Sequence, residues 1–250
     1  MPIYSPCDEM EIRKSSKKGL HIDCNIEELK KDNILFNVYK IFGNTTGIWP
    51  NIHITLKKSI PMGAGLGGGS SNAAAFLDYL KRYLKVKERD VVINGIAIKC
   101  GADVPFFLKK KICIVEGIGE KLRDIEMDFG SYYLVVVYPK INISTSWAYK
   151  KIDEARARSK WSLTTPLFDI KYLTHLAGRY WSNDFEDVVF ENYRELAKIK
   201  AELLILGAKA CVLSGSGSSI VALVPNLQIL DLIKKNFSGK RVLLFINKGV

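Results

Sequence analysis

The residues whose types and spacing best suit chemistry are gathered in one stretch, PMGAGLGGGSSN, at positions 61–72. It holds five glycines, two serines and an asparagine, between a strand-like and a helix-like segment. The first N–H groups of a helix lack partners within it, and the helix dipole makes that end positive. Glycine leaves these groups open to a phosphate and adopts the positive φ that a nest of N–H groups requires. A tight turn needs only one or two glycines, so the stretch predicts a phosphate-binding loop.

Every residue of this stretch is a candidate for binding nucleotide phosphates: Pro61, Met62, Gly63, Ala64, Gly65, Leu66, Gly67, Gly68, Gly69, Ser70, Ser71 and Asn72. Two common phosphate loops fit it poorly. A Walker loop ends in Gly-Lys-Ser/Thr, and no lysine lies between Met62 and Phe76. Residues 63–68 match Gly-x-Gly-x-x-Gly, but the strand before them alternates apolar and polar residues. A dinucleotide-binding sheet needs an almost wholly apolar strand there.

Hydrophobic periodicity predicts the elements on either side of the loop. Apolar and polar residues alternate over 52–57, which predicts a strand buried on one face. After the loop, apolar residues repeat at helical spacing from 73 to 84. Ser70 or Ser71 is expected to cap that helix, because serine oxygens accept from the free N–H groups of a helix start.

Two further elements are predicted ahead of that strand. Residues 34–42 place their apolar side chains on one helical face, with Asp32 or Asn33 as the cap. Residues 10–13 and 20–24 are separated by polar turn residues and predict a β-hairpin.

The rest of the chain continues the alternation of strands and helices. Strands are expected at 111–117, 132–140, 210–214, 220–224 and 241–247, and helices at 152–161, 176–190, 193–208 and 227–237. This order predicts an α+β fold in two layers, built twice. A turn near Gly130 suits a boundary, so we expect domains at 1–128 and 129–250.

Composition and charge indicate an ordinary globular protein. No apolar run has the length of a membrane-spanning helix and the amino terminus does not resemble a signal peptide, so we expect a cytoplasmic protein without a membrane partner. The five cysteines and three histidines are scattered, which predicts neither a disulfide framework nor a metal site. The formal charge of +11 favours anionic ligands. The lysines and arginines of the chain form short groups with no aromatic residues between them, which favours a solvated basic surface over a nucleic-acid partner.

Several stretches resemble the motifs of one enzyme family. PMGAGLGGGSSNAA is similar to the second signature motif of the GHMP kinases, named for galactokinase, homoserine kinase, mevalonate kinase and phosphomevalonate kinase. Its ending most resembles the members that phosphorylate 4-diphosphocytidyl-2-C-methyl-D-erythritol (CDP-methylerythritol). Other stretches agree in the same order: GADVPFFL (101–108), EGIGE (116–120), PKINISTSWAYK (139–150), NDFE (183–186) and LSGSGSS (213–219). The resemblance covers most of the chain.

The resemblance implies a fold, cofactors and a substrate. The fold is the two-domain GHMP kinase fold, with a ribosomal-S5-domain-2-like amino-terminal domain and a ferredoxin-like carboxyl-terminal domain. The cofactors are ATP and Mg²⁺, and the acceptor is the 2-hydroxyl of CDP-methylerythritol, in non-mevalonate isoprenoid synthesis. The protein would be a monomer or a homodimer.

The resemblance also assigns roles to residues outside the glycine-rich stretch. By itself, ADVP favours a turn in which Asp103 accepts backbone hydrogen bonds, whereas the resemblance makes Asp103 the base that activates the substrate hydroxyl. By itself, SGSGSS favours a simple hairpin turn. The resemblance makes it the third motif, which contacts the nucleotide through Ser214, Gly215, Ser216 and Gly217.

Two residues of STSWAYK are implied to bind the acceptor. Tyr149 occupies the position of an aromatic that stacks on cytosine, and Thr145 that of a polar substrate contact. A half-buried core tyrosine is an equal alternative for Tyr149. Trp147 faces another way and is expected to pack.

The chain departs from the family pattern at its start. Family members begin with a strand that carries a Pro-Ala-Lys-Ile-Asn-Leu-like motif, followed by Gly-Tyr-His, and neither occurs in this sequence. In the family, that lysine helps to place the reacting groups, and the tyrosine and histidine contact cytosine. Either Met1 lies inside a longer protein, or the chain is a shortened ATP-binding relative with impaired catalysis. A GHMP kinase that acts on another alcohol also remains open.

Overall fold

The computed structural model describes residues 4–84, 89–125, 129–130, 132–158, 181–240 and 242–248. These residues form two units. The first contains Pro6–Ile60 and Gly67–Ile125, and the second contains residues 4–5, Pro61–Leu66 and the described residues from 129 onward. The glycine-rich stretch is therefore shared between the units, with the change after Leu66. The predicted domain limits, 1–128 and 129–250, stay a prediction, because residues 126–128 lie outside the described part.

The first unit is built on a three-stranded sheet with β3 (Ile52–Lys57) at its centre. The strand β1 (Glu9–Lys14) pairs antiparallel with β3, and β2 (Leu20–Cys24) pairs parallel with it. The predicted hairpin is therefore wrong, although both of its strands exist. The one-sided burial predicted for β3 is confirmed, because its three apolar side chains are buried and enter the core. A strand that supplies so much of the core is stabilised by neighbours on both edges, and its insertion separates β1 from β2.

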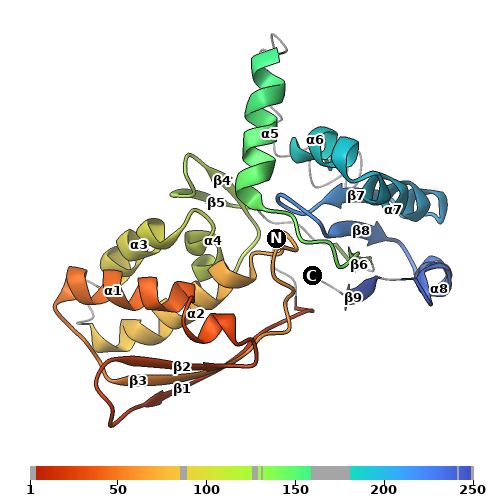
Figure 1. The fold of residues 1–250 in the computed structure, drawn as a ribbon. Coiled ribbons are helices and arrows are strands. Elements are labelled where there is room, and N and C mark those ends of the chain that lie inside the picture. The colour runs from red at the N-terminus through yellow and green to blue at the C-terminus, as the bar shows by residue number, and fades with distance from the viewer. Residues whose placement is uncertain are drawn as a thin grey trace. The chain divides into compact units, whose positions relative to one another are not determined.

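Helices cover one face of this sheet, as Figure 1 shows for α1 and α2. The elements that follow β2 are η1 (Glu28–Lys30), α1 (Ile34–Thr46), α2 (Gly68–Leu80), η2 (Lys81–Tyr83), α3 (Arg89–Cys100), α4 (Val104–Lys109), β4 (Cys113–Glu116) and β5 (Lys121–Asp124). The side chain of Asn33 accepts from the backbone N–H of Leu35, which confirms it as the cap of α1. Leu35, Val38 and Phe42 bury the predicted apolar face of that helix.

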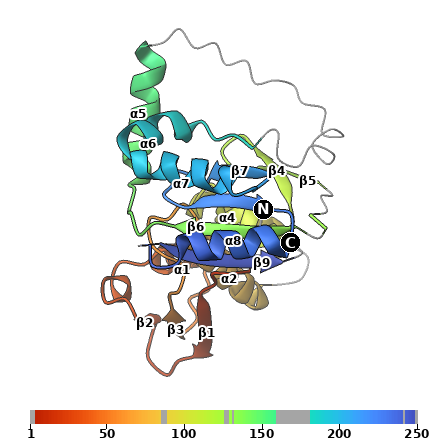
Figure 2. The ribbon, with the colours of Figure 1, turned by 90° about the vertical axis from the view of Figure 1, so that its right-hand side faces the viewer.

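The second unit has a four-stranded antiparallel sheet in the order β7-β8-β6-β9. Its elements are β6 (Tyr133–Tyr138), α5 (Thr145–Arg158), α6 (Phe185–Asn192), α7 (Arg194–Ile205), β7 (Ala210–Leu213), β8 (Ile220–Val224), α8 (Leu227–Phe237) and β9 (Leu243–Lys248). The helices α7 and α8 lie over the same face of the sheet (Figure 2), and their apolar residues join alternate residues of β6 and β8 in one core. Residues 176–180 of the predicted fourth helix lie outside the described residues.

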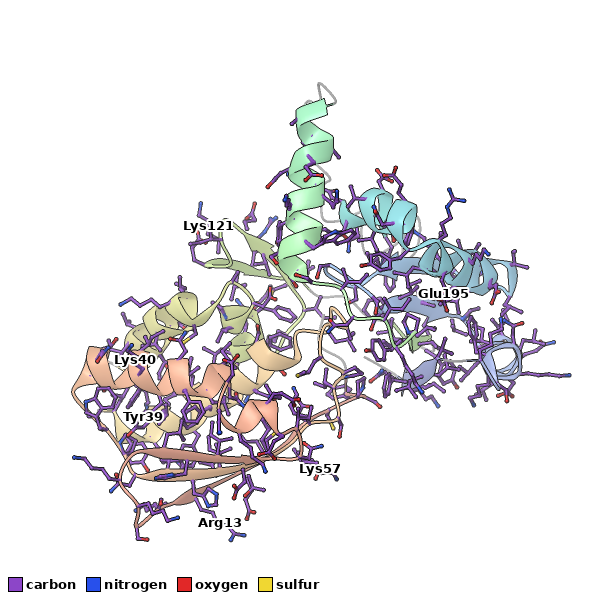
Figure 3. All side chains as sticks on the ribbon, viewed as in Figure 1. Arg13, Tyr39, Lys40, Lys57, Lys121 and Glu195 are labelled. Carbon is purple, nitrogen blue, oxygen red and sulfur yellow. The ribbon has the colours of Figure 1, made fainter. Side chains whose placement is uncertain are left out.

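The basic surface of the first unit carries paired charges. Arg13 and Lys57 project from the three-stranded sheet in Figure 3, and they form ion pairs with Glu11 and Glu9, respectively. Exposed pairs of this kind contribute little to stability, about 0–1 kcal/mol. Within the part of the chain that the structure describes, no helix is both long and apolar enough to cross a bilayer.

The buried thiol of Cys211 in β7 makes the stability of the second unit depend on pH. Burial raises its pKa to about 12; Lys200 opposes this rise and Glu186 adds to it. The unfolded chain has a thiol pKa of about 8.5, so at higher pH it loses a proton that the folded chain keeps. The free energy of unfolding should therefore fall by about 1.4 kcal/mol per pH unit from this group between about pH 9 and pH 11.

Urea unfolding of wild type and Cys211→Ala across that pH range measures this contribution. We expect the variant to have a constant offset from the lost packing and a shallower fall in stability as the pH rises. Parallel pH dependences in the two proteins would show that Cys211 does not ionise on unfolding.

Candidate functional site

The first part of the glycine-rich stretch, residues 61–66, is bound to other loops of the second unit through backbone groups. The hydroxyl of Ser214 donates to the Gly65 carbonyl at 2.8 Å, and the N–H of Ser219 donates to the Ala64 carbonyl at 3.1 Å. The N–H of Ile143 donates to the Gly63 carbonyl at 3.4 Å. The third-motif turn between β7 and β8 thus holds Ala64 and Gly65, and Ile143 holds Gly63.

Two glycines of this part are required by space as well as by conformation. Gly65 has φ of 72°, and a Cβ on it would lie 2.0 Å from the carbonyl oxygen of Ser214. Gly63 has φ of 63°, and a Cβ there would lie 1.6 Å from Oδ1 of Asn142. Neither site accepts another residue without moving a neighbour, and at Gly65 that neighbour is backbone.

The second part of the stretch starts α2 in the first unit. Gly67 is the N-cap, with φ of 65°, and no side chain caps the helix. The prediction that Ser70 or Ser71 caps this helix is therefore wrong. Both lie inside the first turn, where their helical backbone keeps them from capping, and the hydroxyl of Ser71 donates to the Gly68 carbonyl at 2.9 Å. The helix does start at a glycine without a side-chain cap, but its N-cap is Gly67, three residues before Ser70.

A buried ion pair beside this helix start was missed in the sequence. Lys58 pairs with Asp8, and their side chains are 5% and 2% exposed. The other oxygen of Asp8 accepts from the N–H groups of Ser59 and Ile60, each at 2.8 Å. The Nζ atom of Lys58 lies 3.1 Å from where a Cβ of Gly68 would be, so a fixed positive charge adjoins the start of α2. The only signal for it was the basic pair Lys57-Lys58 just before the motif.

Asp103 also belongs to the first unit, at the start of α4. It is exposed, and its side chain makes no capping hydrogen bond, so the turn in which it accepts from the backbone is not formed. Phe107 of the same helix lies against the glycine-rich stretch, because its ring is 2.7 Å from where a Cβ of Gly67 would be. The structure therefore brings α4 and the start of α2 together, with the carboxylate of Asp103 open to solvent.

The predicted acceptor residues lie at the start of α5 in the second unit. The hydroxyl groups of Thr145 and Ser216 are 3.0 Å apart, which joins one predicted substrate residue to the third motif. Tyr149 is 57% exposed, and its ring meets Phe185 edge-on at 5.0 Å between centroids. Trp147 packs against the core, as predicted.

The site residues thus form two groups, each within one unit. One group joins residues 61–66, the turn 214–217 and Thr145, and the other joins residues 67–72, Lys58 and α4. The group in the first unit by itself provides uncapped N–H groups at the start of α2, serine hydroxyls and the open carboxylate of Asp103, which suits a phosphorylated ligand.

Comparison with known proteins identifies the family. Residues 33–111 match the GHMP kinases N terminal domain, and residues 164–240 match the GHMP kinases C terminal domain. The chain is 38% identical over 266 residues to the 4-diphosphocytidyl-2-C-methyl-D-erythritol kinase of Lawsonia intracellularis (strain PHE/MN1-00), covering 98% of this chain and 85% of that protein. The chain belongs to the GHMP kinase family.

Solved structures agree with this assignment. A crystal structure of 4-(cytidine 5'-diphospho)-2C-methyl-D-erythritol kinase matches this GHMP kinase with a TM-score of 0.75 at 25% identity, over 97% of this chain and 87% of that chain. A homoserine kinase from Cytophaga hutchinsonii ATCC 33406 matches with a TM-score of 0.66 at 22% identity, over 99% and 87% of the two chains, which supports the fold alone. The predicted α+β GHMP kinase fold is confirmed.

The contact between Gly65 and Ser214 can be tested by adding one methyl group. Gly65→Ala should lower the melting temperature by several degrees, because the new Cβ forces residues 61–66 away from the turn and strains a positive φ. Gly69→Ala is the matched control, since a Cβ at Gly69 would meet nothing within 4 Å. Differential scanning fluorimetry should show an unchanged or raised melting temperature for the control; equal losses in both variants would contradict the close approach.

Proposed function

We propose that this GHMP kinase transfers the γ-phosphoryl group of ATP to the 2-hydroxyl of CDP-methylerythritol, a step of non-mevalonate isoprenoid synthesis. The observation that carries the proposal is the bare glycine-capped start of α2 in a chain whose relatives are named for this reaction. That the protein works in the cytoplasm, as a monomer or a homodimer, remains a prediction.

The phosphates of ATP would bind to the glycine-rich stretch, residues 61–72. The N–H groups of the first turn of α2 have no side-chain cap and are available to an anion. Lys58 lies at the same helix end, but Asp8 balances its charge, so the N–H groups of α2 would supply most of the attraction for phosphate. The third-motif residues 214–217 would hold residues 61–66 in place.

Asp103 would be the base that takes the proton of the acceptor hydroxyl. Its exposed carboxylate makes no capping bond within the chain, so both of its oxygens can accept from a substrate. Thr145 would contact the acceptor and Tyr149 would stack on cytosine. The exposure of the Tyr149 ring supports stacking over a half-buried core role, because one ring face must be open to receive a base.

Mg²⁺ would neutralise charge on the ATP phosphates. In the part of the chain that the structure describes, no three His, Cys, Asp or Glu side chains gather as a metal site. This fits Mg²⁺ in a kinase, which takes most of its ligands from phosphates and water and needs only one or two protein oxygens. The hydroxyl of Ser70, in the first turn of α2, would offer one such oxygen, and the ion would supply charge stabilisation to phosphoryl transfer.

The proposed acceptor is tested by ADP release with purified protein. CDP-methylerythritol should support ATP-dependent turnover, whereas methylerythritol 4-phosphate, homoserine and mevalonate should not, because the cytidine group supplies binding energy in the family. Turnover with homoserine or mevalonate would assign the chain to another GHMP reaction. ATP binding without turnover on any alcohol would make it the non-catalytic relative.

The role of Asp103 is tested by Asp103→Asn. The variant should lose about 10²–10⁴-fold in kcat and keep its affinity for ATP, because an amide occupies the same space and cannot take a proton. Asp90→Asn, at an exposed carboxylate paired with Lys81 on the same unit, is the control and should keep full turnover. Unchanged kcat in Asp103→Asn would remove Asp103 from the reaction.

A further inference from the structure

The motif NDFE, residues 183–186, is attached to the third-motif turn by its first residue. The side-chain amide of Asn183 donates to the Leu213 carbonyl and to the Gly215 carbonyl, both at 2.7 Å. Its Oδ1 atom accepts from the N–H of Phe185 at 2.9 Å at the start of α6. Three of the four bonds available to the amide are therefore formed, and two of them hold the turn.

The last residue of the motif holds the same strand end through a different group. One carboxylate oxygen of Glu186 accepts from the N–H of Leu213 at 2.8 Å, and the other pairs with Lys200 at 2.6 Å. The Glu186 and Lys200 side chains are only 15% and 21% exposed, so this pair is better shielded than a surface pair. Both backbone groups of Leu213, where β7 ends, are thus held by side chains of one motif.

These bonds continue into the glycine-rich stretch. Ser214 follows Leu213, whose N–H and carbonyl are both hydrogen-bonded to the motif, and the hydroxyl of Ser214 donates to the Gly65 carbonyl. The backbone N–H of Ser214 donates to the Ser219 carbonyl at 2.8 Å and closes the turn. The backbone N–H of Ser219 donates to the Ala64 carbonyl. Displacement of Leu213 or Gly215 would therefore shift the groups that hold residues 61–66. All these residues belong to the second unit.

We propose that Asn183 and Glu186 are positioning residues for ATP. They touch no proposed ligand and act through the turn 213–219, which fixes the backbone of residues 61–66. The proposal rests on the proposed function only in taking residues 61–66 as part of the phosphate site.

The chemistry of the contact explains why an amide stands at 183. Two carbonyl oxygens face the same Nδ2 atom, so the position requires a group with two N–H donors. An aspartate has the same shape and still accepts from Phe185, but it would turn an unprotonated oxygen toward both carbonyls. Asn183→Asp therefore removes both hydrogen bonds to the turn while keeping the bond that the Phe185 N–H donates to residue 183.

The decisive measurement is the ATP affinity of Asn183→Asp, by calorimetry and as KM in the kinase assay. We expect the dissociation constant and KM for ATP to rise about tenfold while kcat changes much less, because the loop binds ATP alike in ground and transition states. A purely structural defect would lower the active fraction, and hence kcat, without raising KM.

Acidic pH provides a second readout specific to the positioning role. Protonation of the new carboxyl group restores one donor facing the two carbonyls, and hydrogen bonding to the neutral form raises its pKa. The ratio of variant to wild-type dissociation constants should therefore shrink as the pH falls from about 8 to about 5.5. A damaged fold would not recover on acidification.

Matched controls exist in the same unit. Asn226 caps α8 by accepting from Ile229 at 3.0 Å, so Asn226→Asp makes the same exchange away from the turn and should bind ATP as wild type does. Glu186→Gln, which weakens the pair with Lys200, should weaken ATP binding in the same direction. Its control is Glu202→Gln, because Glu202 pairs with Lys240 at the same 2.6 Å.

The outcomes separate the two proposals. Wild-type affinity for ATP in both Asn183→Asp and Glu186→Gln, with folded proteins by circular dichroism, would overturn the positioning role. Weakened ATP binding that acid restores in Asn183→Asp would support it even if CDP-methylerythritol proved not to be the acceptor. Should Asn183→Asp fail to fold, Glu186→Gln against Glu202→Gln decides the question.

Discussion

The close approach of two backbones between residues 61–66 and the third-motif turn is the constraint on which the rest of the second unit's site depends. A methyl group at Gly65 would overlap the Ser214 carbonyl, so this contact exists only while that position is bare. The hydroxyl of Ser214 then reaches the Gly65 carbonyl and replaces water on it. Because the two glycines of residues 61–66 contribute no side-chain packing and many conformations are open to them, neighbouring groups must fix the conformation of this segment.

The start of α2 meets the opposite demand, since its N–H groups must be left without partners. Gly67 provides the left-handed turn into the helix and has no side chain that could cap it. Burying Lys58 next to this positive helix end is costly, and Asp8 offsets the cost by pairing with the ammonium group while also accepting two backbone N–H groups. The first unit thus keeps free N–H donors at the positive end of a helix, which favours a phosphate.

Patterns local in sequence were predicted well. The alternation in 52–57 gave the buried face of β3, and the apolar spacing after Asn33 gave α1 with its cap, because burial on one face and capping depend on neighbouring residues. The hairpin of 10–13 with 20–24 failed, since β3, distant in sequence, takes the place between the strands. The serine caps failed because the chain enters the helix at Gly67, and a glycine run permits several starting points of similar energy.

The sequence by itself determined the family, the glycine-rich loop and the identity of its candidate residues, because these are carried by residue types at short spacing. Tertiary structure alone decided which residues hold the loop. Lys58 is far from Asp8 in the sequence, and Asn183 and Glu186 are far from the turn to which they are hydrogen-bonded. Contacts between residues so far apart produce no periodic pattern in the sequence. They arise only when the sheets have formed, since strand pairing sets which loop ends meet.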